Sequence, residues 1–180
     1  MRAHPSPLVN SLHGSAGNLT ARRDRRGTVL TLRTHPPNNI QVDEPVTSWI
    51  VDSIVGTGWT PIVGSWVPTS PEPTAYLAGY HRATLTGYAI SQFVPTLPLE
   101  QLYHIYEWHP VDPTLHNNVL HQIRVGIASM NHYVNQAVNG GQWNFIASYT
   151  LNPATALVRN GGGGGVNLAA DAIRFSTVLL

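Results

Sequence analysis

Three side chains of the kinds that bind metal ions lie close together in this 180-residue chain: His104, Glu107 and His109. Imidazole nitrogens and carboxylate oxygens are common zinc ligands, so a metal-dependent β-barrel enzyme is one hypothesis for this segment. On an extended strand, however, residues five positions apart point to opposite faces, so only Glu107 and His109 share a face. A third ligand would have to come from one of four distant histidines, His81, His116, His121 and His132. We therefore predict no metal site and no other cofactor.

The other residue types that catalyse reactions are absent or scattered. The chain contains no cysteine, which excludes disulfides, thiolate metal sites and a cysteine nucleophile. All ten basic residues are arginine, so Schiff-base chemistry on lysine is excluded as well. The nine Asp and Glu residues are dispersed, and no Gly-x-Ser-x-Gly or His-x-x-x-His motif occurs. A pair of carboxylates from distant strands, as in glycosidases, is the catalytic arrangement that remains. We predict that the protein has no catalytic residues and is not an enzyme.

The clearest candidate for contact with nucleic acid is a short basic segment near the N-terminus. Arg22, Arg23, Arg25 and Arg26 surround Asp24 and give a local charge near +3. Four guanidinium groups allow a few phosphate contacts, which would be weak and independent of base sequence. Because the net charge of the whole chain is only +1, we expect any nucleic-acid contact to be confined to this segment.

Two further patterns each allow a binding role and a structural one. The five tryptophans could form a platform on which sugar rings stack, or could pack into the core, as large aromatic side chains usually do: Trp49, Trp59, Trp66, Trp108 and Trp143. The run Gly161 to Gly165 could cradle a phosphate, but no lysine follows it. We expect this glycine run to be a flexible hairpin tip or surface loop.

The elements that would position these residues are mostly short strands. Apolar residues alternate with polar ones in several runs, most clearly from Val119 to Ser129 and from Gln142 to Thr150, which is the period of a half-buried strand. Prolines, glycines and asparagines separate the runs. The segment from Ser129 to Val138 is the exception, because its apolar spacing and the following Gly140 predict a short helix.

This pattern predicts an all-β protein: a jelly roll or β-sandwich of about eight to ten strands, with at most one or two short helices. Residues 1–26 lack apolar periodicity and contain the arginine cluster, so we expect a flexible N-terminal arm there and a single folded domain over residues 27–180. The N-terminus lacks the continuous apolar core of a signal peptide, and the chain has no apolar run of 18 residues. We therefore expect neither secretion nor a transmembrane segment.

The order of these features resembles the single jelly-roll coat proteins of small icosahedral viruses. A mobile arm with arginines precedes about eight strands and proline-rich loops, and only 11% of the residues are charged. The resemblance implies a structural capsid or capsid-associated protein in a virion, one that self-assembles into homo-oligomers through neutral polar surfaces. Its partners would be copies of itself and other capsid proteins. Packaging arms usually carry more than four basic residues, so we do not expect this arm to neutralise a genome. Either the genome is neutralised by other means, or the subunit contacts a membrane, a second coat protein or an outer layer.

Two alternatives remain at the level of sequence. One is a β-sandwich module that binds carbohydrate, as lectins do, through exposed tryptophan and tyrosine side chains. The other is the metal-dependent enzyme built on His104, Glu107 and His109. If the protein is not viral, the missing signal peptide predicts a cytoplasmic location.

Overall fold

The structure is a computed structural model that describes residues 47–84, 87–163 and 167–180 with their side chains, together with the backbone of four short strands between residues 22 and 42. The chain divides into two compact units, residues 1–45 and residues 46–180. The smaller unit contains two hairpins, β1 (Arg22–Arg23) with β2 (Val29–Leu30) and β3 (Leu32–His35) with β4 (Asn39–Val42). No helix in the described residues is long and apolar enough to cross a membrane.

The larger unit contains twelve strands and one turn of 3-10 helix. In chain order these elements are β5 (Ser48–Asp52), β6 (Trp59–Val63), β7 (Val67–Thr69), η1 (Tyr76–Ala78), β8 (Tyr80–Thr84), β9 (Tyr88–Phe93), β10 (Gln101–Trp108), β11 (Val119–Val125), β12 (Ala128–Val134), β13 (Trp143–Leu151), β14 (Val158–Gly163), β15 (Asn167–Ala170) and β16 (Ala172–Ser176). The predicted all-β sandwich is therefore confirmed.

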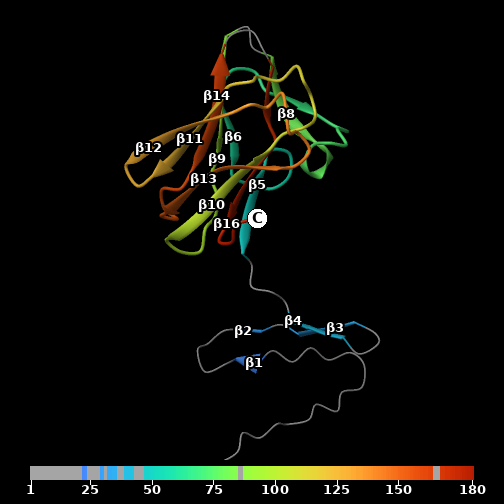
Figure 1. Ribbon diagram of the computed structural model, residues 1–180, viewed down its shortest axis with the longest axis vertical. Coiled ribbons are helices and arrows are strands. Elements are labelled where there is room, and N and C mark those ends of the chain that lie inside the picture. The colour runs from blue at the N-terminus through green and yellow to red at the C-terminus, as the bar shows by residue number, and fades with distance from the viewer. Residues whose placement is uncertain are drawn as a thin grey trace, which may run out of the picture. The chain divides into compact units, whose positions relative to one another are not determined.

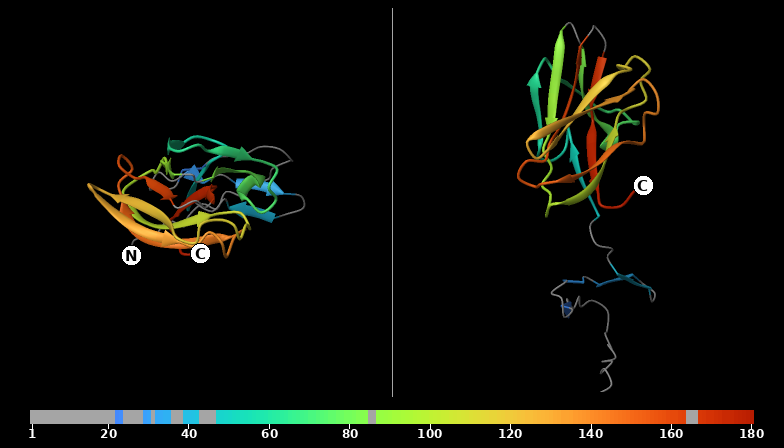
Figure 2. Two further views of the ribbon diagram at one scale, coloured as in Figure 1. Left: turned by 90° about the horizontal axis from the view of Figure 1, so that it is seen from above. Right: turned by 60° about the vertical axis from the view of Figure 1, so that its left-hand side comes forward.

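Two antiparallel sheets form the body of the sandwich (Figure 1). One sheet has four strands in the order β13-β10-β16-β5, and the other has five in the order β12-β11-β14-β9-β6. From β9 onward the chain passes to the other sheet at almost every connection, and the last strand, β16, returns to pair with the first, β5. This is the connectivity of a jelly roll, with β6, β7 and β8 inserted between its first two strands. Figure 2 shows β5 in cyan and β16 in red side by side.

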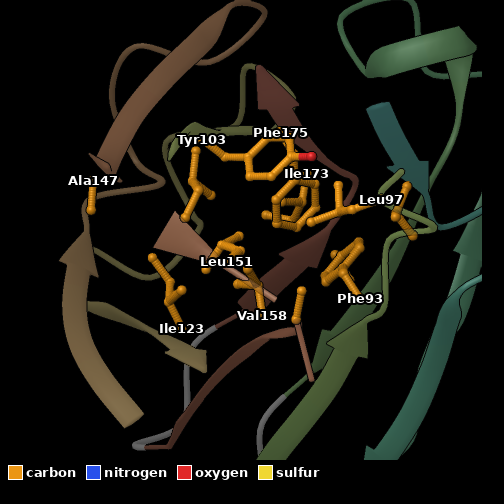
Figure 3. Packing of buried hydrophobic residues seen from close by; sticks show 13 residues of the cluster. Phe93, Leu97, Tyr103, Ile123, Ala147, Leu151, Val158, Ile173 and Phe175 are labelled. Atoms are coloured by element: carbon orange, nitrogen blue, oxygen red, sulfur yellow. The ribbon is translucent and has the colours of Figure 1, made fainter. Parts of the chain in front are cut away.

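The core lies between the inward faces of the two sheets (Figure 3). Strand side chains alternate in direction, so every second residue along β16 and along most of β10 points inward. Tyr103, Ile105 and Phe175 from the four-stranded sheet are fully buried, and they meet Ile123 and Val158 from the five-stranded sheet. Burying one such side chain contributes roughly 1.5–3 kcal/mol to stability. The period-two pattern of the sequence therefore has a direct physical origin in this core.

A third, smaller sheet in the order β15-β8-β7 continues the sandwich at one end. Small side chains dominate its packing, with Ala83, Ala89 and Leu168 buried together. Two prolines lie inside strands, Pro61 in β6 and Pro68 in β7, although the sequence suggested that prolines would fall between strands. Both strands are sheet edges, where a missing N–H donor leaves no ladder hydrogen bond unmade.

The predicted helix over residues 129–138 is wrong, because most of this segment is strand β12, Ala128–Val134. The strand pairs along its whole length with β11, from Val119 opposite Val134 to Val125 opposite Ala128. Gly126 has a φ of 60°, which lets the chain reverse direction in a tight turn between the two strands. Cross-strand pairing with β11 therefore outweighs the helical spacing of the apolar residues.

The glycine run was also misread in part. Gly161, Gly162 and Gly163 belong to strand β14 and pair with β9, while Gly164 and Gly165 lie outside the described residues. A Cβ atom on Gly161 would lie 3.0 Å from the carbonyl oxygen of Ala89, and one on Gly162 would lie 3.0 Å from Leu168 Cδ1. The glycines thus allow close approach of neighbouring backbone and side chains within the sandwich.

Two further glycines provide a matched test of the packing. Gly56 and Gly58 have nearly equal φ angles of 98° and 100°, but a Cβ on Gly56 meets open space, whereas one on Gly58 collides with the carbonyl oxygen of Val94. Both alanine substitutions carry a conformational penalty of about 1 kcal/mol. We expect Gly58→Ala to lose a further ~1–3 kcal/mol through the collision. Urea unfolding of the two variants tests this, and equal losses would contradict the described loop geometry.

The boundary predicted between a flexible arm, residues 1–26, and a folded domain, residues 27–180, falls at Gly27, outside the described residues. This division therefore stays a prediction.

Candidate functional site

The outward face of the four-stranded sheet carries the most distinctive surface of the larger unit. Because Ile173 and Phe175 point into the core, the residue between them, Arg174, points outward. The strand register places Arg174 opposite Tyr106 on β10, and Trp108 on β10 opposite Trp143 on β13. Side chains from three adjacent strands thus share one face of the sheet.

Aromatic side chains gather at one end of this outward face. The ring centroids of Trp108 and Trp143 lie 5.4 Å apart, and Tyr76 of η1 lies 5.8 Å from Trp108 and 5.2 Å from Trp143. All three rings are partly exposed. Phe145, two residues along β13, is 53% exposed and packs edge-on against the buried ring of Tyr106. We call Tyr76, Trp108, Trp143 and Phe145 the aromatic face.

Hydrogen bonds hold Trp108 in place on this face. Its indole Nε1–H donates to the carbonyl oxygen of Thr74 over 2.9 Å. The Thr74 hydroxyl donates to a Glu72 carboxylate oxygen over 2.8 Å and accepts the backbone N–H of Val111 over 2.9 Å. The loop before η1 is therefore tied to both the Trp108 ring and the loop that follows β10. A ring fixed in this way loses little conformational entropy when something packs on it.

The backbone around Tyr76 is held in an uncommon conformation. Leu77 and Ala78 have φ angles of 50° and 61°, in the left-handed region that non-glycine residues rarely occupy. The backbone N–H of Tyr76 donates to both carboxyl oxygens of Asp171 at 3.2 Å. Backbone strain of this kind persists only where surrounding contacts enforce it, and it concentrates at functional sites.

Arg174 is the cation of this face. Its guanidinium carbon lies 5.7 Å from the centroid of the Trp143 ring, within the range of a cation–π contact. Because β10 lies between β16 and β13, the side chain must cross β10 to reach that ring. Its Nε atom is shielded from solvent and has no hydrogen-bond partner among the described residues.

A buried polar network lies behind the aromatic face, on the inward side of the same strands. His109 is fully buried, and its two ring nitrogens face Glu107 Oε1 at 2.6 Å and the carbonyl oxygen of Val138 at 2.9 Å. A backbone carbonyl and a carboxylate both accept hydrogen bonds, so this arrangement favours the form of the ring that carries a proton on both nitrogens. Burial alone would lower the pKa of His109, but the hydrogen bond to Glu107 and its negative charge outweigh that effect and raise it.

Two more buried carboxyl groups lie at the end of the sheet beside Tyr76. Burial raises the pKa of Asp171 to about 9, and the nearby charges of Asp52 and Glu107 add to the increase. Burial also raises the pKa of Asp52, although backbone N–H groups of Val55 and Ile54 donate to it. Asp171 is therefore neutral at pH 7, which suits its position 2% exposed beneath the loop.

The residues of the metal hypothesis do not come together. His104 lies on the outward face, where its Nδ1 lies 2.7 Å from the Ser148 hydroxyl, whereas Glu107 and His109 are buried on the inward side and hydrogen-bonded to each other. Both ring nitrogens of His109 are occupied, so it has no lone pair for a metal. Among the described residues no cluster of three potential ligands occurs.

The five tryptophans separate into different environments. Only Trp108 and Trp143 belong to the aromatic face. Trp49 packs against the core and Tyr103 at 5.6 Å, and Trp59 lies 6.2 Å from Trp66 next to the core.

The four arginines of the predicted basic segment belong to the smaller unit, residues 1–45. The side chains of Arg22 and Arg23 and all of Arg25 and Arg26 lie outside the described residues. Their predicted phosphate contact stays a prediction.

Two hollows in the described part of the chain are partly open to solvent. A hollow of about 190 Å³ is lined mainly by apolar residues around Trp49 and Pro95, and another of about 300 Å³ lies around Arg124 and Leu157. Sites for small molecules usually measure about 300–1,000 Å³ and contain converging polar groups. The aromatic face, which is open, is therefore the better candidate for a binding site.

Comparisons with known proteins identify what this sandwich is similar to. Residues 49–177 match the family model described as the Golvesin C-terminal domain. Among solved structures, a xanthan lyase from Paenibacillus matches with a TM-score of 0.67 and 25% sequence identity. The match covers 79% of this chain and 14% of the lyase, so the chain spans only a small part of that protein. No curated protein matches the chain.

These matches overturn the prediction of a virus coat or capsid-associated protein, which is wrong. The family match covers both sheets, from β5 to the end of β16, and the structural match is to part of a xanthan lyase. The resemblance to coat proteins rested on the arginine-bearing arm, the number of strands, the proline-rich loops and the low charge. Jelly rolls with those properties occur in lectin domains as well as in capsids, so architecture alone could not separate the two.

Proposed function

Because this chain belongs to the Golvesin C-terminal domain family, we propose that it is a non-catalytic module that binds carbohydrate through the aromatic face. The observation that carries the proposal is the group formed by Tyr76, Trp108 and Trp143, whose ring centroids lie 5.2–5.8 Å from one another on an open sheet face. The proposal corresponds to the carbohydrate-binding alternative from the sequence.

The chemistry of the face suits a sugar ring. One side of a pyranose presents C–H groups that pack on an aromatic ring, while its hydroxyls remain free to bond to water or to polar neighbours. Partly exposed rings that are already fixed, as Trp108 is by its bond to Thr74, gain this contact with little ordering. Because these side chains lie on the outward face of a sheet, we expect a polysaccharide chain to bind along its length and not by its end.

The lyase match supports a role beside an enzyme and not as one. The name of that protein says that it acts on xanthan, a polysaccharide, and the matched part is 14% of its length. In this chain the buried Glu107–His109 pair is shielded from solvent, and the carboxyl groups of Asp52 and Asp171 are also buried. None of these groups faces an open cleft where a glycosidic bond could reach it. We therefore propose that the module serves to hold carbohydrate.

Removal of one ring tests the function. We expect Trp143→Ala to weaken binding to soluble polysaccharides at least about tenfold, since the aromatic residues at the centre of an interface carry most of the binding energy. Retardation in gels containing xanthan, alginate or hydroxyethylcellulose measures the affinity. Tyr133→Ala is the matched control, because Tyr133 is 62% exposed on the other sheet and should leave binding unchanged.

Two results would contradict this proposal. One is a folded wild-type protein that is not retarded by any polysaccharide of a broad panel. The other is an equal loss of binding in Trp143→Ala and Tyr133→Ala, which would place the binding site away from the aromatic face. Near-ultraviolet circular dichroism of each variant, recorded first, establishes that its sandwich is intact.

A further inference from the structure

Arg174 differs from the other arginines whose side chains the structure describes. Arg82 pairs with Asp112 at 3.3 Å, Arg159 donates to Gln92 at 3.0 Å, and Arg124 donates to the carbonyl oxygen of Gly126 at 3.3 Å. The Nε atom of Arg174, by contrast, is shielded and has no hydrogen-bond partner among the described residues, while the guanidinium lies over the Trp143 ring. A guanidinium has five N–H donors, and a shielded charged donor without a partner is costly. As far as the described residues go, this Nε–H is therefore available to a further acceptor.

The surroundings of Arg174 would strengthen a hydrogen bond between its guanidinium and an anion. Its neighbours across the sheet are Tyr106 and Ile50, neither of which carries a charge, and its guanidinium lies over Trp143. The rings displace water from one side of the guanidinium. An anion that reaches the group meets an unscreened charge in a setting where charge-assisted hydrogen bonds are strong.

From this arrangement we infer that the carbohydrate bound by the aromatic face is acidic, with a hexuronate carboxylate accepting hydrogen bonds from the Arg174 guanidinium. The inference rests on the proposed function and specifies its ligand class. The planar fork of arginine matches the two oxygens of a carboxylate. The sugar ring then contacts the exposed aromatic side chains while its C6 carboxylate reaches the cation that crosses β10.

The test uses oligosaccharide pairs that differ only at C6. In each pair one member is a hexuronate oligomer, such as tetragalacturonate, and the other is its carboxyl-reduced form, in which C6 carries a hydroxyl. We expect the wild-type protein to bind the acidic member of at least one pair about tenfold more tightly by isothermal titration calorimetry. This preference should shrink as salt concentration rises.

Arg174→Met keeps the length of the apolar stem and removes the charge. We expect it to lose the preference for the acidic oligomers, so that it binds the two members of each pair with equal affinity. Arg174→Lys keeps a cation without the planar fork and should retain only part of the preference. Arg159→Met, on the opposite sheet, removes the same charge from the whole protein and should leave the preference intact.

The outcomes separate the two proposals. If the wild type binds both members of every pair equally, the inference about Arg174 is wrong, while the glycan-binding function stands. If Arg159→Met removes the preference as fully as Arg174→Met does, overall charge and not the site selects the ligand, and the inference is again wrong. If no oligomer or polymer binds to the folded protein, the proposed function fails and this inference fails with it.

Discussion

Glu107→Ala is expected to lower the free energy of unfolding by about 3–5 kcal/mol, which is the usual loss when one partner of a buried ion pair is removed. The change leaves the buried ring of His109 without the carboxyl group that lies 2.6 Å from it in the native protein and raises its pKa. It also removes the acceptor that the Gln136 side-chain amide approaches at 3.5 Å. Urea unfolding at pH 7, followed by tryptophan fluorescence, measures the loss.

A double-mutant cycle separates the pair from the cavity that the substitution creates. If the ion pair is the cause, Glu107→Ala and His109→Ala together should destabilise by less than the sum of the two single changes. Glu100→Ala is the control for loss of a carboxylate, because Glu100 is exposed and bonds only the Asn152 side chain; it should change stability by less than about 1 kcal/mol. Additive losses in the cycle would show that Glu107 and His109 are not coupled.

Asp171→Asn is expected to remove a large part of the pH dependence of stability. The unfolded chain releases the Asp171 proton near pH 4, whereas the folded protein, with a pKa of about 9, retains it. Between these values the folded state binds the extra proton, so this group makes stability fall as pH rises, by up to about 1.4 kcal/mol per pH unit. The variant is therefore expected to be close to wild type near pH 4 and more stable than wild type near pH 8.

The free energy of unfolding is measured as a function of pH for the wild type and for Asp171→Asn. The difference between the two curves reports mainly on Asp171, since His109, His81 and Asp52 are common to both proteins. Asp112→Asn serves as the control. Although burial alone would raise the pKa of Asp112, hydrogen bonds from Thr114 and the charge of Arg82 lower it. This group therefore loses its proton below the range of pH 4 to pH 9 in which Asp171 acts. Parallel stability curves for wild type and Asp171→Asn between pH 4 and pH 9 would contradict the described burial of this carboxyl.

The sandwich could be predicted because its core follows local rules. In a segment such as Val119 to Val125, the alternation of apolar and polar residues predicts which face of the strand is buried, and no information from the rest of the chain is needed. The helix predicted after Ser129 failed because helix and strand spacings overlap over ten residues, and pairing with β11 decides between them. The prediction of a flexible loop over the glycine run failed for a similar reason. Only the close approach of Ala89 and Leu168 shows why larger side chains are excluded at Gly161 and Gly162.

The candidate site was visible only in part. Trp108 and Trp143 stand out in the sequence, but their contact depends on the register between β10 and β13, and 34 residues separate them along the chain. Tyr76 joins them from a loop in which Leu77 and Ala78 have left-handed φ angles. Since neither residue is a glycine, the sequence does not indicate this loop conformation. In the sequence Arg174 is an ordinary outward residue of a strand, and its position over the Trp143 ring depends on the order of three strands in the sheet. Long-range register therefore separates the predictable fold from the unpredictable site.

The pairing of β5 with β16 has a mechanical consequence. The two strands are antiparallel neighbours, and the backbone N–H of Thr177 donates to the carbonyl oxygen of Thr47 at 2.7 Å, so the chain enters and leaves the sandwich at one point. Tension applied through residues 47 and 177 acts perpendicular to the two strands. It loads the hydrogen bonds between β5 and β16 one after another, beginning with the bond between Thr177 and Thr47. The sandwich would thus peel open from that end at low force, whereas a pull along the strands would load all the bonds of the ladder together.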